Sequence, residues 1–253
     1  MKHPLAAEID TLVGDAIARR IFPGAVVLVA RGDEIAYWSA TGATVYESAE
    51  AQPIVRDTIY DIASLTKMFT ATAALRLADA GLLDLAAPAA RYLPDLRATE
   101  VTITHLLTHT SGLDIRLSVL REQGAAGIWR TVRALEPARP PGTSVAYTNV
   151  NSLLLGAIVE QCAGAPLDRA FGELIFAPLG LRDTGFCPPP ALHGRIAPTE
   201  HDPEWRGGLV HGTVHDESAH ALGGVAGHAG LFSSAGELWQ FCRMWLRAAA
   251  GEA

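Results

Sequence analysis

The chain has 253 residues, of which 49% are apolar and 19% are charged, so it can bury a substantial core and does not have the composition of a disordered protein. Its net charge of −7 comes from acidic and basic residues mixed along the chain, which excludes the basic stripe that nucleic-acid binding requires. The three cysteines, Cys162, Cys187 and Cys242, are too far apart for a CxxC metal pair or a disulfide framework, and we expect them to be reduced.

The first residues, Met1-Lys2-His3-Pro4, precede no long apolar stretch, so they do not resemble a secretory signal. No apolar run in the chain is long enough to span a membrane; the run Ala25–Ala30 is typical. As written, the chain is expected to have no membrane segment and to be cytoplasmic, and a further upstream segment would change that expectation.

The predicted elements begin with an amphipathic helix from Ala6 to Arg20, which Pro23-Gly24 follows. The β-branched run Ala25–Ala30 predicts a buried strand. A tight turn at Arg31–Glu34 and a returning strand at Ile35–Ala40 complete a hairpin.

A helical composition runs from Leu65 to Ala80 and ends at Gly81. A second long helix is expected from about Asn149 to Ala163, with Gly164 as its stop, and a last one from about Ala235 to Ala250. Short helices and loops are expected between the first two. Residues 186–230 are rich in Gly, Pro and His and favour no single assignment.

Ser64-Leu65-Thr66-Lys67 places a hydroxyl and an ammonium three residues apart, which on a helix puts them on one face. A serine hydroxyl is a weak nucleophile until a neighbour accepts its proton, and a partly buried lysine can do so because burial lowers its pKa. Alone, the pattern is weak, because Ser-x-x-Lys occurs by chance in many proteins and more often marks an N-cap serine with a solvated lysine.

Tyr147-Thr148-Asn149 follows Pro141-Gly142 further along the chain. A tyrosine near a lysine loses its proton more easily, and an asparagine amide can orient a substrate carbonyl. Tyr147 could otherwise be an ordinary core or turn residue.

Together these motifs resemble those of the serine β-lactamases of class C type and the related penicillin-binding proteins and esterases; Ser-x-x-Lys is a signature of such enzymes. The segments 106–113, 177–181 and 229–234 are also similar to that family, in the family's order. Ser-Asp-Asn and Lys-Thr-Gly, the companions found in class A enzymes, are absent, and Tyr-x-Asn resembles class C.

The resemblance implies an α/β (α+β) fold of the β-lactamase/transpeptidase type, in which a helical region packs on an antiparallel sheet flanked by the terminal helices. It implies a single domain over 1–253, with an N-terminal helix and hairpin at 6–45 and the nucleophile helix and helical region at 60–253. The implied reaction is acyl-enzyme formation on a β-lactam, a D-alanyl peptide or a small ester. Ser64 would be the nucleophile, Lys67 and Tyr147 would handle the proton, and Asn149 would bind the acyl amide. No cofactor is expected, and the oligomeric state is left open.

The family's third motif, Lys-Thr-Gly or a His-Thr-Gly-like sequence, is expected on a strand near the family's C-terminus. His228-Ala229-Gly230 is similar in spelling but lies in a Gly-rich segment that we expect to precede a helix directly. We therefore expect the chain to lack the family's C-terminal part, in which case its sheet keeps only the strands of the N-terminal hairpin. The alternative is that His228 takes the place of the third motif.

Two other functions stay open. The chain could be a catalytically incomplete binding module, or a metallohydrolase that uses its histidine-rich stretch. That stretch contains no His-Glu-x-x-His, so no metal ligand is assigned. The histidines of this stretch, with three acidic residues beside them, are His193, His201, Asp202, His211, His215, Asp216, Glu217, His220 and His228.

Overall fold

The computed structural model describes residues 4–46 and 51–252, so Met1–His3, which entered the argument against a secretory signal, lie outside the described residues. The chain divides into two compact units, each assembled from separate segments. The first combines Met1–Tyr60, Pro188–Gly212 and Ser233–Ala253; the second combines Asp61–Cys187 and Thr213–Phe232. The expectation of a single domain over 1–253 stays a prediction.

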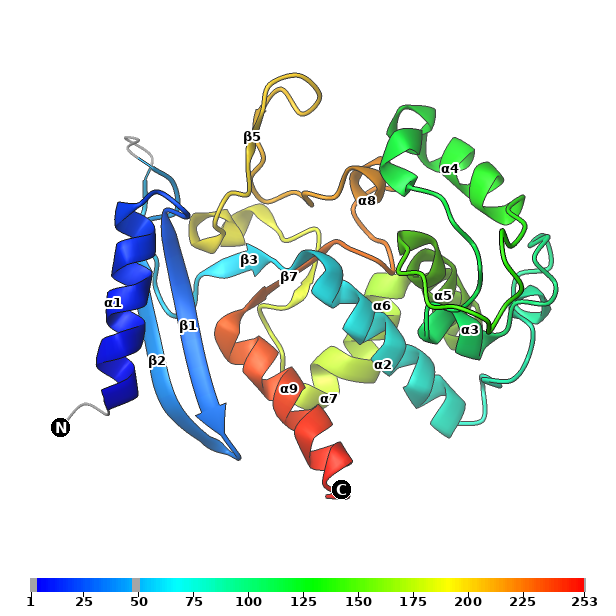
Figure 1. Ribbon diagram of the computed structural model, residues 1–253, viewed down its shortest axis with the longest axis horizontal. Coiled ribbons are helices and arrows are strands. Elements are labelled where there is room, and N and C mark those ends of the chain that lie inside the picture. Colours follow the sequence, from blue (N-terminus) through cyan, green and yellow to red (C-terminus); the bar gives the residue numbers. More distant parts are fainter. Residues whose placement is uncertain (1–3, 47–50, 253) are drawn as a thin grey trace. The chain divides into compact units, whose positions relative to one another are not determined.

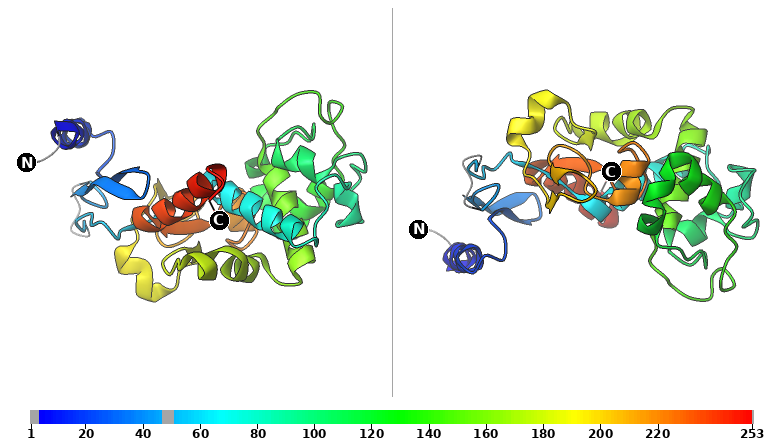
Figure 2. Two further views of the ribbon diagram at one scale, coloured as in Figure 1. Left: turned by 90° about the horizontal axis from the view of Figure 1, so that it is seen from below. Right: turned by 90° about the horizontal axis from the view of Figure 1, so that it is seen from above.

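The first unit is built on a hairpin with a terminal helix against each of its strands. Figures 1 and 2 show α1 beside the hairpin; α1 contacts β2, and α9 contacts β1. The elements of this unit are α1 (Pro4–Ala18), β1 (Gly24–Arg31), β2 (Glu34–Gly42), a 3₁₀ turn (Pro190–Arg195), β5 (His201–Asp202), β6 (Gly208–Leu209) and α9 (Ala235–Ala249).

The hairpin confirms the predicted pair of strands and the tight turn, but the expected burial of Ala25–Ala30 is wrong, because these residues are all partly exposed. β1 and β2 pair antiparallel from Gly24↔Gly42 to Arg31↔Glu34, and Gly32 takes the positive φ of 58° that the two-residue turn requires. α9 is tied to this turn because Arg247 donates to Asp33 at 2.6 Å.

The second unit is mainly helical. Its elements are a 3₁₀ turn (Ala63–Leu65), α2 (Thr66–Asp79), a 3₁₀ turn (Ala89–Arg91), α3 (Ile103–Leu107), a 3₁₀ segment (Leu117–Gln123), α4 (Gly124–Arg133), α5 (Asn149–Ala163), α6 (Leu167–Phe171), a π-helical turn (Gly172–Phe176), α7 (Ala177–Leu179), β4 (Gly185–Phe186) and α8 (Glu217–Ala221).

The core of this unit lies where α2 and α5 pack against each other (Figure 1). Phe69 and Leu77 of α2 and Leu154 and Ile158 of α5 are at most 2% exposed. Gly164 ends α5 in the left-handed conformation, with φ of 64°, as predicted from its position after the apolar pattern.

In the part of the chain that the structure describes, the sheet that contains the hairpin consists of β1 and β2, as expected, but the sequence did not predict the strands of two further sheets. β7 (Leu231–Ser234) lies between β3 (Ile59–Asp61) and β4 in a three-stranded sheet, and β5 pairs with β6. These strands have two to four residues, too few to show an alternating pattern in the sequence. β7 also separates His228-Ala229-Gly230 from α9, so that segment does not precede the helix directly.

Among the described residues, no single helix is long and apolar enough to cross a membrane. Only the pair formed by Asn149–Ala163 and Leu167–Leu179, bent by 76°, passes such a test by length and composition.

Candidate functional site

Ser64 lies in the tight turn that leads into α2. The structure places it in the 3₁₀ turn Ala63–Leu65 and begins the α-helix at Thr66, one residue later than predicted. Asp61 shapes this turn, because its carboxylate accepts the N–H of Ala63 and the N–H of His215, both at 2.7 Å. Ala63 has a φ of 45°, which is unusual for a residue with a side chain and is often found at functional sites. Ser64 itself is exposed at the surface of the unit.

Lys67 is directed at Ser64. In a 3₁₀ turn, residues three apart eclipse one another, so the spacing that predicted a shared face keeps its meaning here. Lys67 Nζ donates to Ser64 Oγ at 2.9 Å and to the backbone carbonyl of His228 at 3.0 Å. The lysine is only 8% exposed, so these two acceptors supply most of what water would otherwise provide.

The segment 227–231 is bound along one face of α2. Besides the Lys67 bond, Thr70 Oγ1 donates to the Gly227 carbonyl at 2.7 Å, and the Leu231 N–H donates to Thr66 Oγ1 at 3.2 Å. Gly227 also packs against α5 so closely that a Cβ on it would lie 3.0 Å from the Cα of Gly156. The carbonyl that receives Lys67 is therefore fixed between the two central helices.

The Tyr147 ring lies beside the same lysine. Lys67 Nζ lies 4.9 Å from the centre of the Tyr147 ring, although the tyrosine is 63% exposed. Partial burial raises the pKa of Tyr147, but hydrogen bonding with Lys67 and Ser64, together with the Lys67 charge, outweighs that effect and brings the pKa below its ordinary value. The structure thus brings Ser64, Lys67 and Tyr147 together.

Asn149 begins α5 and is half-buried. Its side chain is therefore partly accessible, and its amide is available to a ligand. This availability is compatible with the substrate-binding role that the sequence suggests for it.

The segment 106–113, which the sequence singled out without giving it a role, lies against the Tyr147 loop. The His109 ring stacks on the Tyr147 ring with centroids 4.7 Å apart. Asn151 of α5 is fully buried and joins His109 to Ser111. Sequence reasoning missed Asn151; the available signal was a polar residue inside an otherwise apolar helix, which usually marks a buried hydrogen bond.

His228 uses its backbone, and not its side chain, at the site. The imidazole is fully buried, and its Nε2 lies 3.2 Å from Asp216 Oδ1 and 3.0 Å from Ser218 Oγ. Burial raises the pKa of Asp216, but hydrogen bonds from His228, Ser218 and the Ala219 N–H outweigh it and hold that pKa well below its ordinary range. A side chain enclosed in this way is not placed to receive a substrate, which argues against His228 as a substitute for the third motif.

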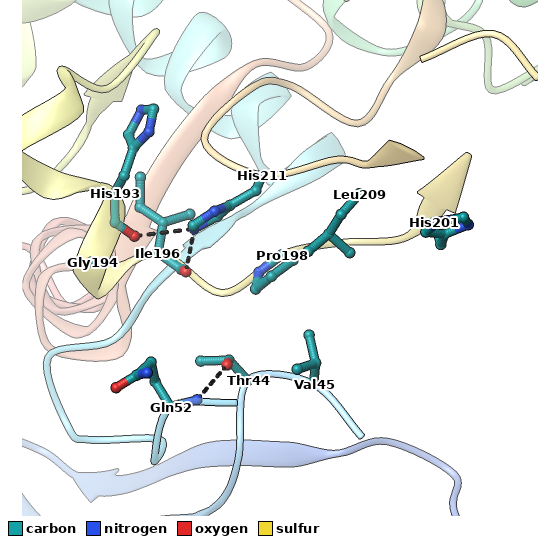
Figure 3. A pocket seen from close by; sticks show the side chains of 10 residues that line it. All are labelled: Thr44, Val45, Gln52, His193, Gly194, Ile196, Pro198, His201, Leu209 and His211. Carbon is teal, nitrogen blue, oxygen red and sulfur yellow. Dashed lines mark hydrogen bonds between the residues drawn. The ribbon is translucent and has the colours of Figure 1, made fainter. Parts of the chain in front are cut away.

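The histidine-rich stretch does not form a common cluster. His193, His201 and His211 belong to the first unit, and His215, His220 and His228 to the second. Figure 3 shows the first three lining a cavity of about 440 Å³ that also contacts Thr44 and Gln52. His211 Nε2 is occupied by the carbonyls of His193 and Ile196, at 3.0 and 2.9 Å. Residues 4–46 and 51–252 contain no group of three or more His, Cys, Asp or Glu side chains that could hold a metal ion.

Comparison with known proteins gives a consistent result. Residues 9–253 match the family model described as Beta-lactamase. The chain is 37% identical over 221 residues to "Esterase EstB" of Burkholderia gladioli, covering 78% of this chain and 55% of the relative. It is 33% identical over 255 residues to a "Putative D-alanyl-D-alanine carboxypeptidase" of Escherichia coli, covering 86% of this chain and 58% of the relative.

Among solved structures, the class C beta-lactamase from Rhodobacter sphaeroides has a TM-score of 0.75 and 28% sequence identity, over 92% of this chain and 63% of that one. The fold is therefore of the β-lactamase/transpeptidase type, as the sequence predicted. The chain spans a little over half the length of the two curated relatives.

Proposed function

Because the chain belongs to the beta-lactamase family, we propose that it acts as a serine hydrolase through an acyl-enzyme on Ser64. The observation that carries this proposal is the 2.9 Å hydrogen bond from Lys67 Nζ to Ser64 Oγ, formed beside a tyrosine whose pKa is lowered. Nucleophilic catalysis by a serine requires an oriented hydroxyl with a proton acceptor nearby; Lys67 orients the hydroxyl here, and Tyr147 is the acceptor.

The proton of Ser64 is assigned to Tyr147. Lys67 already donates to Ser64 Oγ and to the His228 carbonyl, so as an ammonium it orients the hydroxyl and favours the phenolate form of Tyr147. Ser64 Oγ then attacks the acyl carbon while Tyr147 takes its proton. The same proton passes to the leaving group when the acyl bond breaks, and water later releases the acyl group from Ser64.

Two further groups of the protein are proposed to bind the substrate. Asn149 is assigned to the acyl side chain of the substrate because its amide is available, and the Ser64 N–H is assigned to the oxyanion. The substrate is an activated acyl compound: a small ester, a D-alanyl peptide or a β-lactam. A small ester is the first to test, because the relative with 37% identity is named an esterase.

The test is covalent labelling of Ser64, followed by mass spectrometry of the labelled peptide. An activated ester, a fluorophosphonate and a penicillin serve as probes. We expect the unmodified chain to gain one covalent group on Ser64 with at least one probe, an acyl group from the ester or the penicillin or a phosphonyl group from the fluorophosphonate, and Ser64→Ala to gain none. Ser144→Ala, which removes an exposed serine from the loop before Tyr147, is the matched control and should label normally. Reversible binding without a covalent product would favour the binding-module alternative, and equal labelling of Ser64→Ala would contradict the proposal.

A further inference from the structure

Tyr147 needs something other than burial to fix its position. It lies in the loop between α4 and α5, and its side chain is 63% exposed. Proton transfer requires a donor and an acceptor within hydrogen-bond reach of each other, so an exposed side chain on an irregular loop must be oriented by specific contacts.

His109 supplies three such contacts. Its backbone carbonyl accepts the N–H of Ala146 at 2.8 Å. Its Nδ1 accepts the N–H of Thr148 at 3.3 Å. Its ring stacks on the Tyr147 ring at 4.7 Å and 32°. The residues on both sides of Tyr147 and the tyrosine ring itself are therefore held by a single residue.

His109 is in turn fixed from the core. Asn151, which is fully buried, places its Nδ2 3.1 Å from His109 Nδ1, and Asn151 Oδ1 accepts from Ser111 Oγ at 2.5 Å. Two donors on Nδ1 require that nitrogen to be an acceptor, so the ring proton is on Nε2. Burial, and then the charge of Lys67, lower the pKa of His109 and keep the imidazole in this neutral form.

The backbone of His109 also indicates a specialised position. Its φ of 55° lies in the left-handed region, which residues with a side chain rarely adopt. This conformation lets one residue present both its carbonyl and its Nδ1 to the same neighbouring loop. Such outliers persist where the surrounding contacts over-determine them.

We propose that His109 is a positioning residue that clamps Tyr147 in the orientation needed for proton transfer at Ser64. The proposal rests on the proposed function, because it assumes that Tyr147 takes part in acylation. The same contacts argue against His109 as a general base, because its Nδ1 already accepts hydrogen bonds from Thr148 and Asn151.

The variants are chosen to tolerate the left-handed backbone. His109→Gly keeps only the carbonyl contact, and His109→Asn keeps an acceptor near the Nδ1 position but loses the stacked ring. Thr108→Ala is the matched control, because Thr108 is exposed and adjacent in sequence, and its hydroxyl bonds to the Thr104 carbonyl and the Thr110 hydroxyl, away from Tyr147. Thermal melting establishes that each variant is folded.

The experiment is a double-mutant cycle on the rate of Ser64 acylation, with wild type, His109→Gly, Tyr147→Phe and the double variant. We expect His109→Gly to slow acylation at least tenfold, His109→Asn to recover part of that loss, and Thr108→Ala to change nothing. In the Tyr147→Phe background, His109→Gly should change the rate less than twofold, because the group that it positions is gone. An equal loss in both backgrounds would overturn the proposal.

A second measurement does not depend on activity. The pKa of Tyr147 is obtained by ultraviolet titration, as the difference between the protein with and without Tyr147→Phe. If His109 holds Tyr147 beside Lys67, His109→Gly should raise that pKa towards the ordinary value, and His109→Asn should raise it less. If the pKa of Tyr147 is unchanged in His109→Gly, the proposal that His109 positions Tyr147 is overturned. Absence of any acylation in the wild type, with the titration shift present, would instead count against the proposed function alone.

Discussion

At the scale of single residues, Tyr147 and Lys67 give the site its expected pH dependence. The pKa of Tyr147 lies below its ordinary value because hydrogen bonding with Lys67 and Ser64 and the lysine charge stabilise the phenolate. The phenolate is the form that accepts a proton, so acylation should rise with pH and level off below pH 10. In the proposed mechanism, Lys67 lowers the pKa of Tyr147, and Tyr147 takes the proton of Ser64.

Tyr147→Phe is expected to slow acylation by at least about a hundredfold, the usual scale for loss of a general base. It should also remove the bend in the pH–rate profile, because phenylalanine does not titrate. The measurement is the rate of Ser64 acylation by an activated ester between pH 6 and about pH 10. A variant that keeps both the rate and the bend would assign the base to another group.

Lys67→Ala is expected to slow acylation and to move the bend to higher pH. The sign follows from the cause of the shift: removing the ammonium removes two of the influences that lower the pKa of Tyr147, so its pKa rises. Ultraviolet titration of Lys67→Ala, with Tyr147→Phe subtracted, measures this directly. A bend that stays in place would mean that Lys67 does not tune Tyr147.

At the scale of elements, the site depends on the segment 227–231 being held between α2 and α5. Three residues of α2 hydrogen-bond to this segment, and Gly227 contacts Gly156 and Ser152 of α5. Glycine is needed at positions 156 and 227 because the backbone of α5 and the backbone of the segment 227–231 are in direct contact there. The position of the carbonyl that receives Lys67 thus depends on the packing of two helices.

Gly227→Ala tests this packing. Its Cβ would overlap the Ser152 carbonyl, and we expect a loss of about 1–3 kcal/mol in the free energy of unfolding, the usual scale of overpacking. Acylation should slow as well, since the His228 carbonyl is displaced from Lys67. Gly172→Ala is the control, because a Cβ there meets nothing within 4 Å. Urea unfolding and acylation rates are the measurements, and equal behaviour of the two variants would contradict the argument.

At the scale of the whole molecule, the pair formed by partly buried Asp216 and buried His228 connects stability to pH. The pKa of Asp216 is lower in the folded protein than in the unfolded chain. A carboxyl of this kind stabilises the fold at pH values above its unfolded pKa, and the stabilisation is lost as the pH falls. The pair should therefore contribute fully at neutral pH and progressively less in acid.

Asp216→Asn is expected to lower the free energy of unfolding most at pH 7, with a difference from wild type that shrinks between about pH 5 and pH 2. Ser218→Ala removes one hydrogen bond to the same carboxylate and should show a smaller effect in the same direction. Urea unfolding across this pH range is the measurement. A difference that is constant with pH would show that the carboxylate charge is not what stabilises the fold.

The sequence by itself determined the long elements and indicated the groups to which the proposed reaction is assigned. Ser64 and Lys67 lie three residues apart, so any helical turn brings them together, and the apolar spacing of 149–163 with a closing glycine specifies a helix. These features depend on neighbours in sequence, and local periodicity records them directly. The resemblance of several motifs in order then identified the family.

Only the tertiary structure decided what surrounds these groups. The strands β3, β4 and β7 are too short to show a period, and the His228 carbonyl has no side-chain signature at all. His109 Nδ1 accepts the Thr148 N–H and its ring stacks on Tyr147, and no local pattern in the sequence records these contacts. The physical reason is that these contacts join residues far apart in the chain through backbone atoms and buried amides, whose pairing is fixed only when α2, α5 and the intervening loops pack together.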